Sequence, residues 1–193
     1  MALTLHFVRH GKAQDMDGFC IGHTDRALTD QGRDEIESLA RRLDVQDIAC
    51  ISSDLVRASA SAERLTMGHV TTEPRLREMH FGTWERRTWA ELEATDGPGV
   101  QEWMADWTNV RAPGGESFAD VIVRVRSWLD SLARDDTRLL VVAHAGSIRA
   151  AAVVLLDLPP ARSFLLQIDH AQVCTFVLSS HGASLRTWNS RTF

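Results

Sequence analysis

Short runs of β-forming residues alternate with helical patterns along most of the chain, and this alternation restricts the fold more than any other feature of the sequence. Residues 3–8 (LTLHFV) are rich in β-forming types, and residues 138–143 (RLLVVA) form an apolar run of strand length. Between them, residues 29–43 place apolar side chains on one helical face. Strands that alternate with helices predict an α/β three-layer sandwich, in which helices flank a mostly parallel central sheet.

Glycine and proline divide the rest of the chain. Residues 113–115 (PGG) end one segment, and Ser117 with Asp120 forms a capping-box-like helix start directly after them. Residues 84–106 favour a helix interrupted at 96–99 (DGPG), and they belong to a tryptophan-rich insert at about 84–112 within a single predicted domain, 1–193. The other predicted elements are strands at 48–52, 174–178 and 185–188, helices at 55–65, 117–133 and 146–158, and an irregular stretch at 74–82.

A histidine stands within two residues of the end of two predicted strands. Arg9, His10 and Gly11 follow the strand at 3–8, and His144 follows the strand at 138–143. Ligands of open parallel sheets bind outside the carboxyl ends of the strands, because the loops at that edge leave a crevice. The two strand ends therefore predict one shared site.

The residue types near these strand ends suit phosphoryl transfer. Arg9 and Arg57 each offer planar guanidinium contacts to phosphate oxygens, and a neutral imidazole is a competent nucleophile. The leaving alkoxide needs a proton, for which Glu78 is a candidate donor, and two other carboxyl groups, Glu85 and Asp54, compete with it for this role. Both of those have the alternative role of ion-pair partners, and Arg57 has the alternative role of pairing with Asp54.

Composition argues against several classes of protein. The chain carries 21 Lys and Arg against 26 Asp and Glu, a net charge of −5 that disfavours nucleic-acid binding. No apolar stretch approaches the roughly 20 residues of a membrane span, and residues 1–8 lack the basic start of a signal peptide. Three widely spaced cysteines without a CxxC pair disfavour a disulfide framework and a structural zinc site. We therefore expect a cytoplasmic protein without nucleic-acid or membrane partners.

Five motifs, in order along the chain, resemble those of the histidine phosphatase (phosphoglycerate mutase-like) superfamily. They are residues 7–11 (FVRHG), 52–58 (SSDLVRA), 76–85 (LREMHFGTWE), 114–117 (GGES) and 144–149 (HAGSIR). The resemblance implies a phosphoglycerate mutase-like fold, a phosphorylated His10 and Glu78 as the proton donor, with neither metal nor organic cofactor. The residues expected to hold the substrate and its phosphate are Arg9, Arg57, His144, Gly22 and Ala145.

The middle and the end of the chain look most like the α-ribazole-5′-phosphate phosphatases of cobalamin nucleotide-loop assembly. The similar stretches are residues 78–85 (EMHFGTWE), 103–107 (WMADW), 114–118 (GGESF) and 189–191 (NSR). The resemblance implies hydrolysis of a small phosphomonoester, α-ribazole 5′-phosphate. A sugar-phosphate phosphatase, a phosphohistidine-protein phosphatase, a phosphoglycerate mutase and an inactive phosphate-binding sensor stay open, as does a homodimer. A metallohydrolase is disfavoured because no HExxH or HxH spacing occurs.

Some residues depart from the superfamily pattern. Many members have RHGET followed by an asparagine that helps to bind phosphate, whereas Lys12, Ala13 and Met16 stand here. Lys12 either replaces that contact or is a solvated charge. The four tryptophans of the insert either pack it against the core or place one ring on an aromatic leaving group; they are Trp84, Trp89, Trp103 and Trp107. Structural, packing or surface roles are expected for Arg149, His23, His69, His170 and His181.

Overall fold

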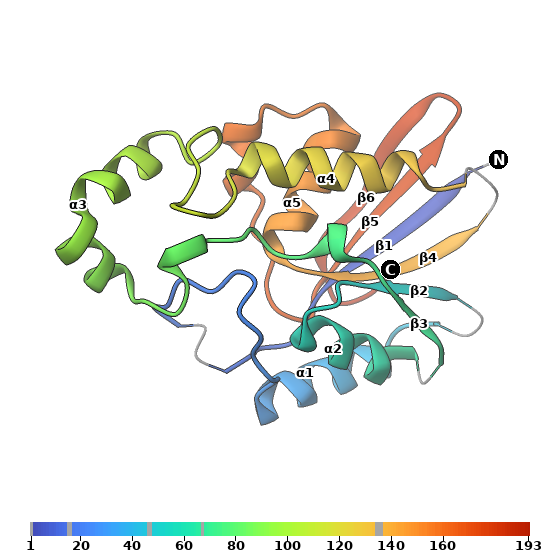
Figure 1. The fold of residues 1–193 in the computed structure, drawn as a ribbon. Helices are drawn as coiled ribbons and strands as arrows, with labels where there is room; N and C mark the ends of the chain where they lie inside the picture. Colours follow the sequence, from blue (N-terminus) through green and yellow to red (C-terminus); the bar gives the residue numbers. More distant parts are fainter. Residues whose placement is uncertain (1, 15–16, 46–47, 67, 134–136) are drawn as a thin grey trace.

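A six-stranded sheet with β1 near its middle organises the molecule (Figure 1). The computed structural model describes residues 2–14, 17–45, 48–66, 68–133 and 137–193. The strand order is β3-β2-β4-β1-β5-β6. Strands β3, β2, β4 and β1 are parallel, whereas β5 is antiparallel to both of its neighbours. The strands are β1 (Leu3–Arg9), β2 (Ala49–Ser52), β3 (Val70–Thr72), β4 (Arg138–Ala143), β5 (Val173–Ser179) and β6 (Gly182–Ser190).

Helices cover both faces of this sheet, as Figure 1 shows. Successive side chains of β1 point to opposite faces, so Leu5 and Phe7 join the core beneath α4 and α5, whereas Val8 joins the core beneath α1 and α2. The result is the predicted α/β three-layer sandwich with a mostly parallel sheet, which confirms the fold class. These four helices are α1 (Asp30–Ala40), α2 (Val56–Thr66), α4 (Phe118–Asp130) and α5 (Ala145–Leu156).

Element boundaries differ from the predicted ones where the sequence pattern is weak. The pattern does not predict β3, because three largely exposed residues are too few to show a period. Helix α1 ends at Ala40, short of the predicted end at 43, and β6 begins at Gly182, before its predicted start. Short 3₁₀ helices at Pro74–Leu76 and Gly82–Trp84 interrupt the loop that was expected to be irregular.

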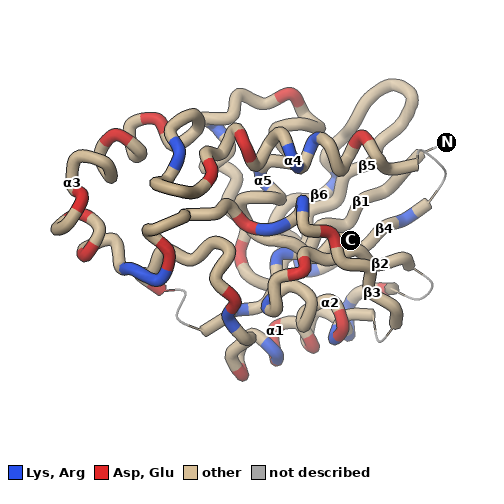
Figure 2. The backbone as a smooth tube through the Cα atoms, in the orientation of Figure 1, with Lys and Arg blue, Asp and Glu red and all other residues tan. Residues whose placement is uncertain are grey.

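Helix α3 (Trp89–Ala105) stands apart from the sheet (Figure 1). It begins with a capping box formed by Thr88 and Glu91. The backbone of Asp96 leaves the helical region, with φ −146° and ψ 45°, which confirms the predicted interruption. The charged residues of α3 are all acidic, and Figure 2 shows these positions along it. No helix in the described parts of the chain is long and apolar enough to cross a membrane.

The three cysteines are free and buried at separate places in the protein. Cys174 on β5 lies in the core beneath α4 and α5, and Cys50 on β2 lies in the core beneath α1 and α2. Cys20 lies where the first of these cores meets the insert, with its backbone hydrogen-bonded to Arg86 and Arg87. Burial raises the pKa of each thiol to about 12. Since the thiolate is the reactive form, these side chains act as small apolar packing groups.

His6 is a buried histidine on β1, away from the strand ends. Its side chain is 4% exposed, and its Nδ1 shares a hydrogen bond of 3.1 Å with the Thr175 hydroxyl. Burial, reinforced by the charge of Arg138, lowers the pKa of His6 from 6.5 to about 4. Between pH 4 and pH 6.5, the unfolded chain therefore binds more protons at His6 than the folded protein does. The contribution of neutral His6 to stability is therefore complete above pH 6.5 and is lost as the pH falls to 4.

We expect the variant His6→Asn to weaken the pH dependence of stability. In the wild-type protein, His6 alone should lower the free energy of unfolding by about 2 kcal/mol between pH 7 and pH 5. Urea unfolding at both pH values measures this, and the variant should lose less stability than the wild type by about that amount. The control is His181→Asn, at an exposed position. Equal losses in wild type and His6→Asn would refute the prediction.

Candidate active site

The carboxyl ends of β1 and β4 place two histidine rings side by side. The two strands are paired in parallel up to Arg9 and Ala143, and the His10 amide then donates to the Ala143 carbonyl at 3.1 Å. The ring centroids of His10 and His144 are 4.9 Å apart, and both side chains are fully buried. The structure therefore brings the two strand-end motifs into one site.

The His10 ring is held in one tautomer. Its Nδ1 lies 2.7 Å from the Gly11 carbonyl, which only accepts hydrogen bonds, so Nδ1 carries the proton and Nε2 is unprotonated, with its lone pair as an acceptor. Burial, with the charges of Arg57 and Arg9, holds the pKa of His10 well below its usual 6.5. Arg57 Nε donates to Nε2 at 3.3 Å. A neutral imidazole with its lone pair beside a cation is suited to attack phosphorus.

Arg57 lies fully buried in the first turn of α2. Its Nη2 donates to the Gly22 carbonyl at 2.7 Å and its Nη1 to the Thr24 carbonyl at 3.1 Å. Gly22, a predicted substrate-binding residue, is thus placed where it holds Arg57. Asp54 instead pairs with Arg77, whose Nε donates to it at 2.7 Å. The alternative partner for Arg57 is therefore occupied elsewhere.

Arg9 approaches the site from the end of β1. Its Nη1 donates to the Ile168 carbonyl at 2.7 Å, and its Nη2 lies 3.2 Å from His170 Nε2. Burial lowers the pKa of both Arg9 and Arg57, and in both cases the negative charge of Glu78 opposes that shift. Glu78 is therefore within electrostatic reach of both guanidinium groups.

His144 keeps one ring nitrogen available. Its Nε2 shares a hydrogen bond of 2.9 Å with the Ser53 hydroxyl, which also accepts from the Leu55 amide at 3.3 Å. Among the described residues, its buried Nδ1 has no hydrogen-bond partner. Burial, with the charges of Arg57 and His10, holds the pKa of His144 well below its usual 6.5. The ring is neutral, and its free nitrogen can serve a bound ligand, since unpaired buried polar atoms are costly.

Glu78 reaches the start of α5 just beyond His144. Its Oε2 accepts from the Gly146 amide at 3.2 Å, and its Oε1 accepts from its neighbour Met79 at 2.9 Å. A Cβ at Gly146 would lie 3.1 Å from the Glu78 carboxyl carbon and would overlap Oε1, so only glycine lets the carboxylate come this close. Ala145, a predicted substrate-binding residue, is the buried first residue of α5.

If Glu78 is the proton donor that the sequence predicts, Gly146→Ala should lower kcat by about 100-fold while leaving the fold intact, because a displacement of about 1 Å at such a group costs this much. The added methyl group should push the Glu78 carboxylate away from the site. The matched control is Gly97→Ala, since Gly97 also lies in a helix and nothing lies within 4 Å of its added Cβ. Steady-state kinetics with thermal melting measures both effects. Wild-type kcat in Gly146→Ala would disprove the placement of Glu78.

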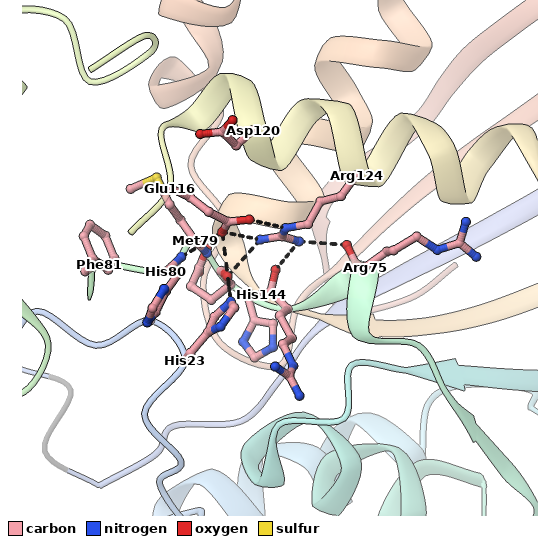
Figure 3. Close-up of polar contacts among 12 residues, drawn as sticks. His23, Arg75, Met79, His80, Phe81, Glu116, Asp120, Arg124 and His144 are labelled. Carbon is pink, nitrogen blue, oxygen red and sulfur yellow. Dashed lines mark hydrogen bonds and ion pairs between the residues drawn. The ribbon is translucent and has the colours of Figure 1, made fainter. Parts of the chain in front are cut away.

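A single arginine on α4 supports the loop that carries Glu78 (Figure 3). Arg124 donates to the carbonyls of Arg75 and Arg77, both at 2.7 Å, and of Glu78 at 2.9 Å. It also forms two hydrogen bonds with the Glu116 carboxylate, at 2.8 and 3.0 Å. Every N–H of the guanidinium is used. Sequence reasoning missed this role, because Arg124 falls on a helix between apolar positions, where a charge is typically solvated.

Glu85, one of the alternative acids, ties the same loop to residues 22–24. Its carboxylate accepts from the amides of His23 at 2.6 Å, Thr24 at 2.5 Å and Phe81 at 3.3 Å. These hydrogen bonds lower the pKa of Glu85 against the opposing effect of its burial. His23 also donates from Nε2 to the Glu78 carbonyl at 2.9 Å. Glu85 therefore has a structural role that keeps it ionised, and Glu78 is the better candidate for proton transfer.

The tryptophans of the insert mainly pack on one another. Trp84 and Trp103 are buried with their rings 5.9 Å apart, and the ring of Trp89 stacks on Trp103 at 5.6 Å. Trp107 contacts Phe164, an exposed aromatic ring, at 4.4 Å. Trp107 also packs on the buried Phe118, with ring centroids 5.0 Å apart. The packing interpretation therefore suits these tryptophans.

Lys12 does not point its charge at the histidines. Its ammonium group pairs with Asp17 at 2.9 Å, which raises the pKa of the lysine. The solvated-charge interpretation is therefore the better one for Lys12 in this structure. Met16, which occupies the asparagine position of other members, lies outside the described residues.

Within the described residues, no group of three or more His, Cys, Asp or Glu side chains is arranged to hold a metal ion.

The comparison with protein families agrees with the geometry of the site. The sequence model of the Histidine phosphatase superfamily (branch 1) matches residues 5–191, almost the whole chain. The chain belongs to this superfamily. Both the predicted membership and the phosphoglycerate mutase-like fold are thereby confirmed, and the protein is a phosphomonoesterase of the histidine phosphatase family.

Relatives of this histidine phosphatase differ in their substrates. It is 28% identical to the adenosylcobalamin/α-ribazole phosphatase of Salmonella typhimurium, over 98% of this chain and 97% of the relative. It is 36% identical to the glucosyl-3-phosphoglycerate phosphatase of Mycobacterium tuberculosis, over 83% of this chain and 78% of the relative. The crystal structure of the α-ribazole phosphatase from Shigella flexneri matches with a TM-score of 0.91, at 28% identity and 98% coverage of both chains.

Proposed function

We propose that this histidine phosphatase hydrolyses α-ribazole 5′-phosphate through a phosphohistidine at His10. The lone pair at His10 Nε2, fixed by the hydrogen bond from Nδ1 to Gly11, is the observation that carries the mechanism. Similarity to α-ribazole phosphatases over nearly the full length of both chains supports the choice of substrate. The reaction is the cleavage of a phosphate ester into an alcohol and inorganic phosphate.

In the first step, His10 Nε2 attacks phosphorus, forming a P–N bond as the P–O bond to the leaving group breaks. The incoming phosphate takes over the hydrogen bond that Arg57 Nε gives to His10 Nε2. Arg9, Arg57 and the free nitrogen of His144 stabilise the charge on the non-bridging oxygens. Glu78, which takes up a proton when the phosphate binds, gives that proton to the leaving oxygen, so the alcohol departs neutral.

In the second step, water attacks the phosphorus of phospho-His10. The Glu78 carboxylate, which gave up its proton in the first step, now accepts one from that water. The P–N bond breaks, phosphate leaves, and the lone pair returns to His10 Nε2. Each residue ends the cycle in its starting protonation state.

An uncharged leaving group fits the surroundings of the Glu78 loop. Helix α3 is joined to this loop through the contact of Phe81 with Trp103, centroid to centroid 6.0 Å, and the charged residues of α3 are all acidic. Such a neighbour favours the neutral riboside of α-ribazole over a carboxylated leaving group. Glucosyl-3-phosphoglycerate is the second candidate, because the relative named for it has the higher identity, 36%.

A substrate panel tests this proposal. Steady-state kcat/KM should be measured for α-ribazole 5′-phosphate, glucosyl-3-phosphoglycerate, 3-phosphoglycerate and a phosphohistidine peptide. We expect α-ribazole 5′-phosphate to lead by about 100-fold, which equals about 2.7 kcal/mol of transition-state preference. Preference for glucosyl-3-phosphoglycerate would refute the substrate and leave the mechanism standing. Comparable rates on every compound would indicate a broad-specificity phosphatase.

A further inference from the structure

A third histidine lies against the nucleophile and the phosphate-binding arginine. The ring of His170 is 5.2 Å from that of His10, centroid to centroid. Its Nδ1 lies 3.1 Å from the His10 carbonyl oxygen, and its Nε2 lies 3.2 Å from Arg9 Nη2. The sequence alone assigns His170 to the surface or to packing, whereas the structure places it between two residues of the site.

The two contacts fix the tautomer of His170. A carbonyl oxygen only accepts, so Nδ1 must carry the proton; a guanidinium only donates, so Nε2 must offer its lone pair. Burial, with the charge of Arg9, lowers the pKa of His170 to about 4. The ring is therefore neutral near pH 7, which is the state that both hydrogen bonds require.

The segment that carries His170 is itself anchored. The Ala171 amide donates to the Arg9 carbonyl at 3.0 Å, and Asp169 exchanges two hydrogen bonds with Asn189 on β6, at 2.8 and 2.9 Å. Arg9 Nη1 donates to Ile168 in the same segment. Two of the N–H groups of Arg9 are thus directed by residues 168 and 170.

We propose that His170 is a positioning residue, which orients the Arg9 guanidinium toward the substrate phosphate by accepting a hydrogen bond from Nη2. This inference rests on the proposed role of Arg9 in phosphate binding. Among the described residues, Arg9 Nε is buried without a partner, so the orientation of this guanidinium depends on its two Nη contacts. Without the acceptor at His170, the Arg9 guanidinium keeps only one of these two contacts, the hydrogen bond from Nη1 to the Ile168 carbonyl.

Two conservative variants separate the contacts of His170. In His170→Gln, the side-chain oxygen lies near the position of the histidine Nε2, so this variant retains the hydrogen bond from Arg9. In His170→Asn, the shorter side chain reaches only the position of Nδ1, so this variant retains the hydrogen bond to the His10 carbonyl and loses the one from Arg9. We expect His170→Ala and His170→Asn to raise the inhibition constant of inorganic phosphate and the KM by about tenfold, with a smaller change in kcat. His170→Gln should stay within about threefold of the wild type. His69→Ala, at an exposed position, serves as the control.

A double-mutant cycle with Arg9→Ala shows whether His170 acts through Arg9. If it does, Arg9→Ala/His170→Ala should bind phosphate as weakly as Arg9→Ala alone. Additive losses, or wild-type phosphate binding in His170→Ala beside a weakened Arg9→Ala, would overturn the proposal for His170 alone. Wild-type phosphate binding in Arg9→Ala would overturn the assigned role of Arg9, and with it the proposed phosphate site.

Discussion

Replacing His10 with alanine is expected to lower kcat at least about 1,000-fold on every phosphomonoester, because the variant lacks the atom that bonds to phosphorus. His10 Nε2 has the required lone pair, and Nδ1 is fixed by Gly11. Arg9, Arg57 and His144 remain in the variant, so substrate binding should weaken much less than turnover. The loss should therefore appear in kcat and leave KM within about tenfold of the wild type.

Trapping the intermediate provides the direct measurement for this prediction. Wild-type enzyme mixed with ³²P-labelled substrate and quenched in alkali should carry labelled, acid-labile phosphate, as a phosphohistidine does. His10→Ala should carry none. His69→Ala, at an exposed position, controls for histidine loss in general. Labelled protein or near-normal turnover in His10→Ala would mean that another group is the nucleophile.

Replacing Glu78 with glutamine should give a loss that depends on the leaving group. Gln has the same shape and can still accept from the Gly146 amide, but it cannot transfer a proton. General acid catalysis is worth about 100- to 10,000-fold, so kcat on an alkyl phosphate should fall by that amount. With p-nitrophenyl phosphate, whose leaving group departs as a stable anion, formation of phospho-His10 should slow far less.

Burst kinetics separates the two steps that Glu78 serves. With p-nitrophenyl phosphate, Glu78→Gln should release nitrophenolate in a fast burst and then turn over slowly, because water lacks its base in the second step. The control is Glu93→Gln, which changes an exposed carboxyl group on α3. A loss equal for alkyl and aryl substrates, without a burst, would argue that Glu78 binds substrate and transfers no proton.

The strand-end part of the site could be predicted because it follows from local pattern and topology together. His10 and His144 each stand within two residues of the end of a run of strand-forming residues, and parallel strands end at the same edge of a sheet. The chemistry of arginine and histidine then indicates a phosphate ligand. Edge strand β3 could not be predicted in this way, since three residues show no period.

The supporting residues could not be predicted, because their partners are distant along the chain. Arg124 donates to carbonyls 46–49 residues earlier, and His170 donates to the carbonyl of His10, 160 residues earlier. Carbonyl groups are present at every position, so a hydrogen bond to one leaves no trace in the sequence of the acceptor. Arg124 and His170 thus look like ordinary polar residues until the fold is known.

The position of β1 in the sheet makes this strand wait until late in synthesis for the strands that pair with it. Both neighbours of β1, β4 and β5, begin only at Arg138 and Val173. A ribosome that has completed residues 1–130 has produced His10, Arg57 and Glu78 but neither strand that pairs with β1. The nascent chain therefore carries an apolar strand with both edges open, a form that invites aggregation. Any translation product that ends before β5 exposes one of these edges, so chaperone capture of nascent chains should centre on β1.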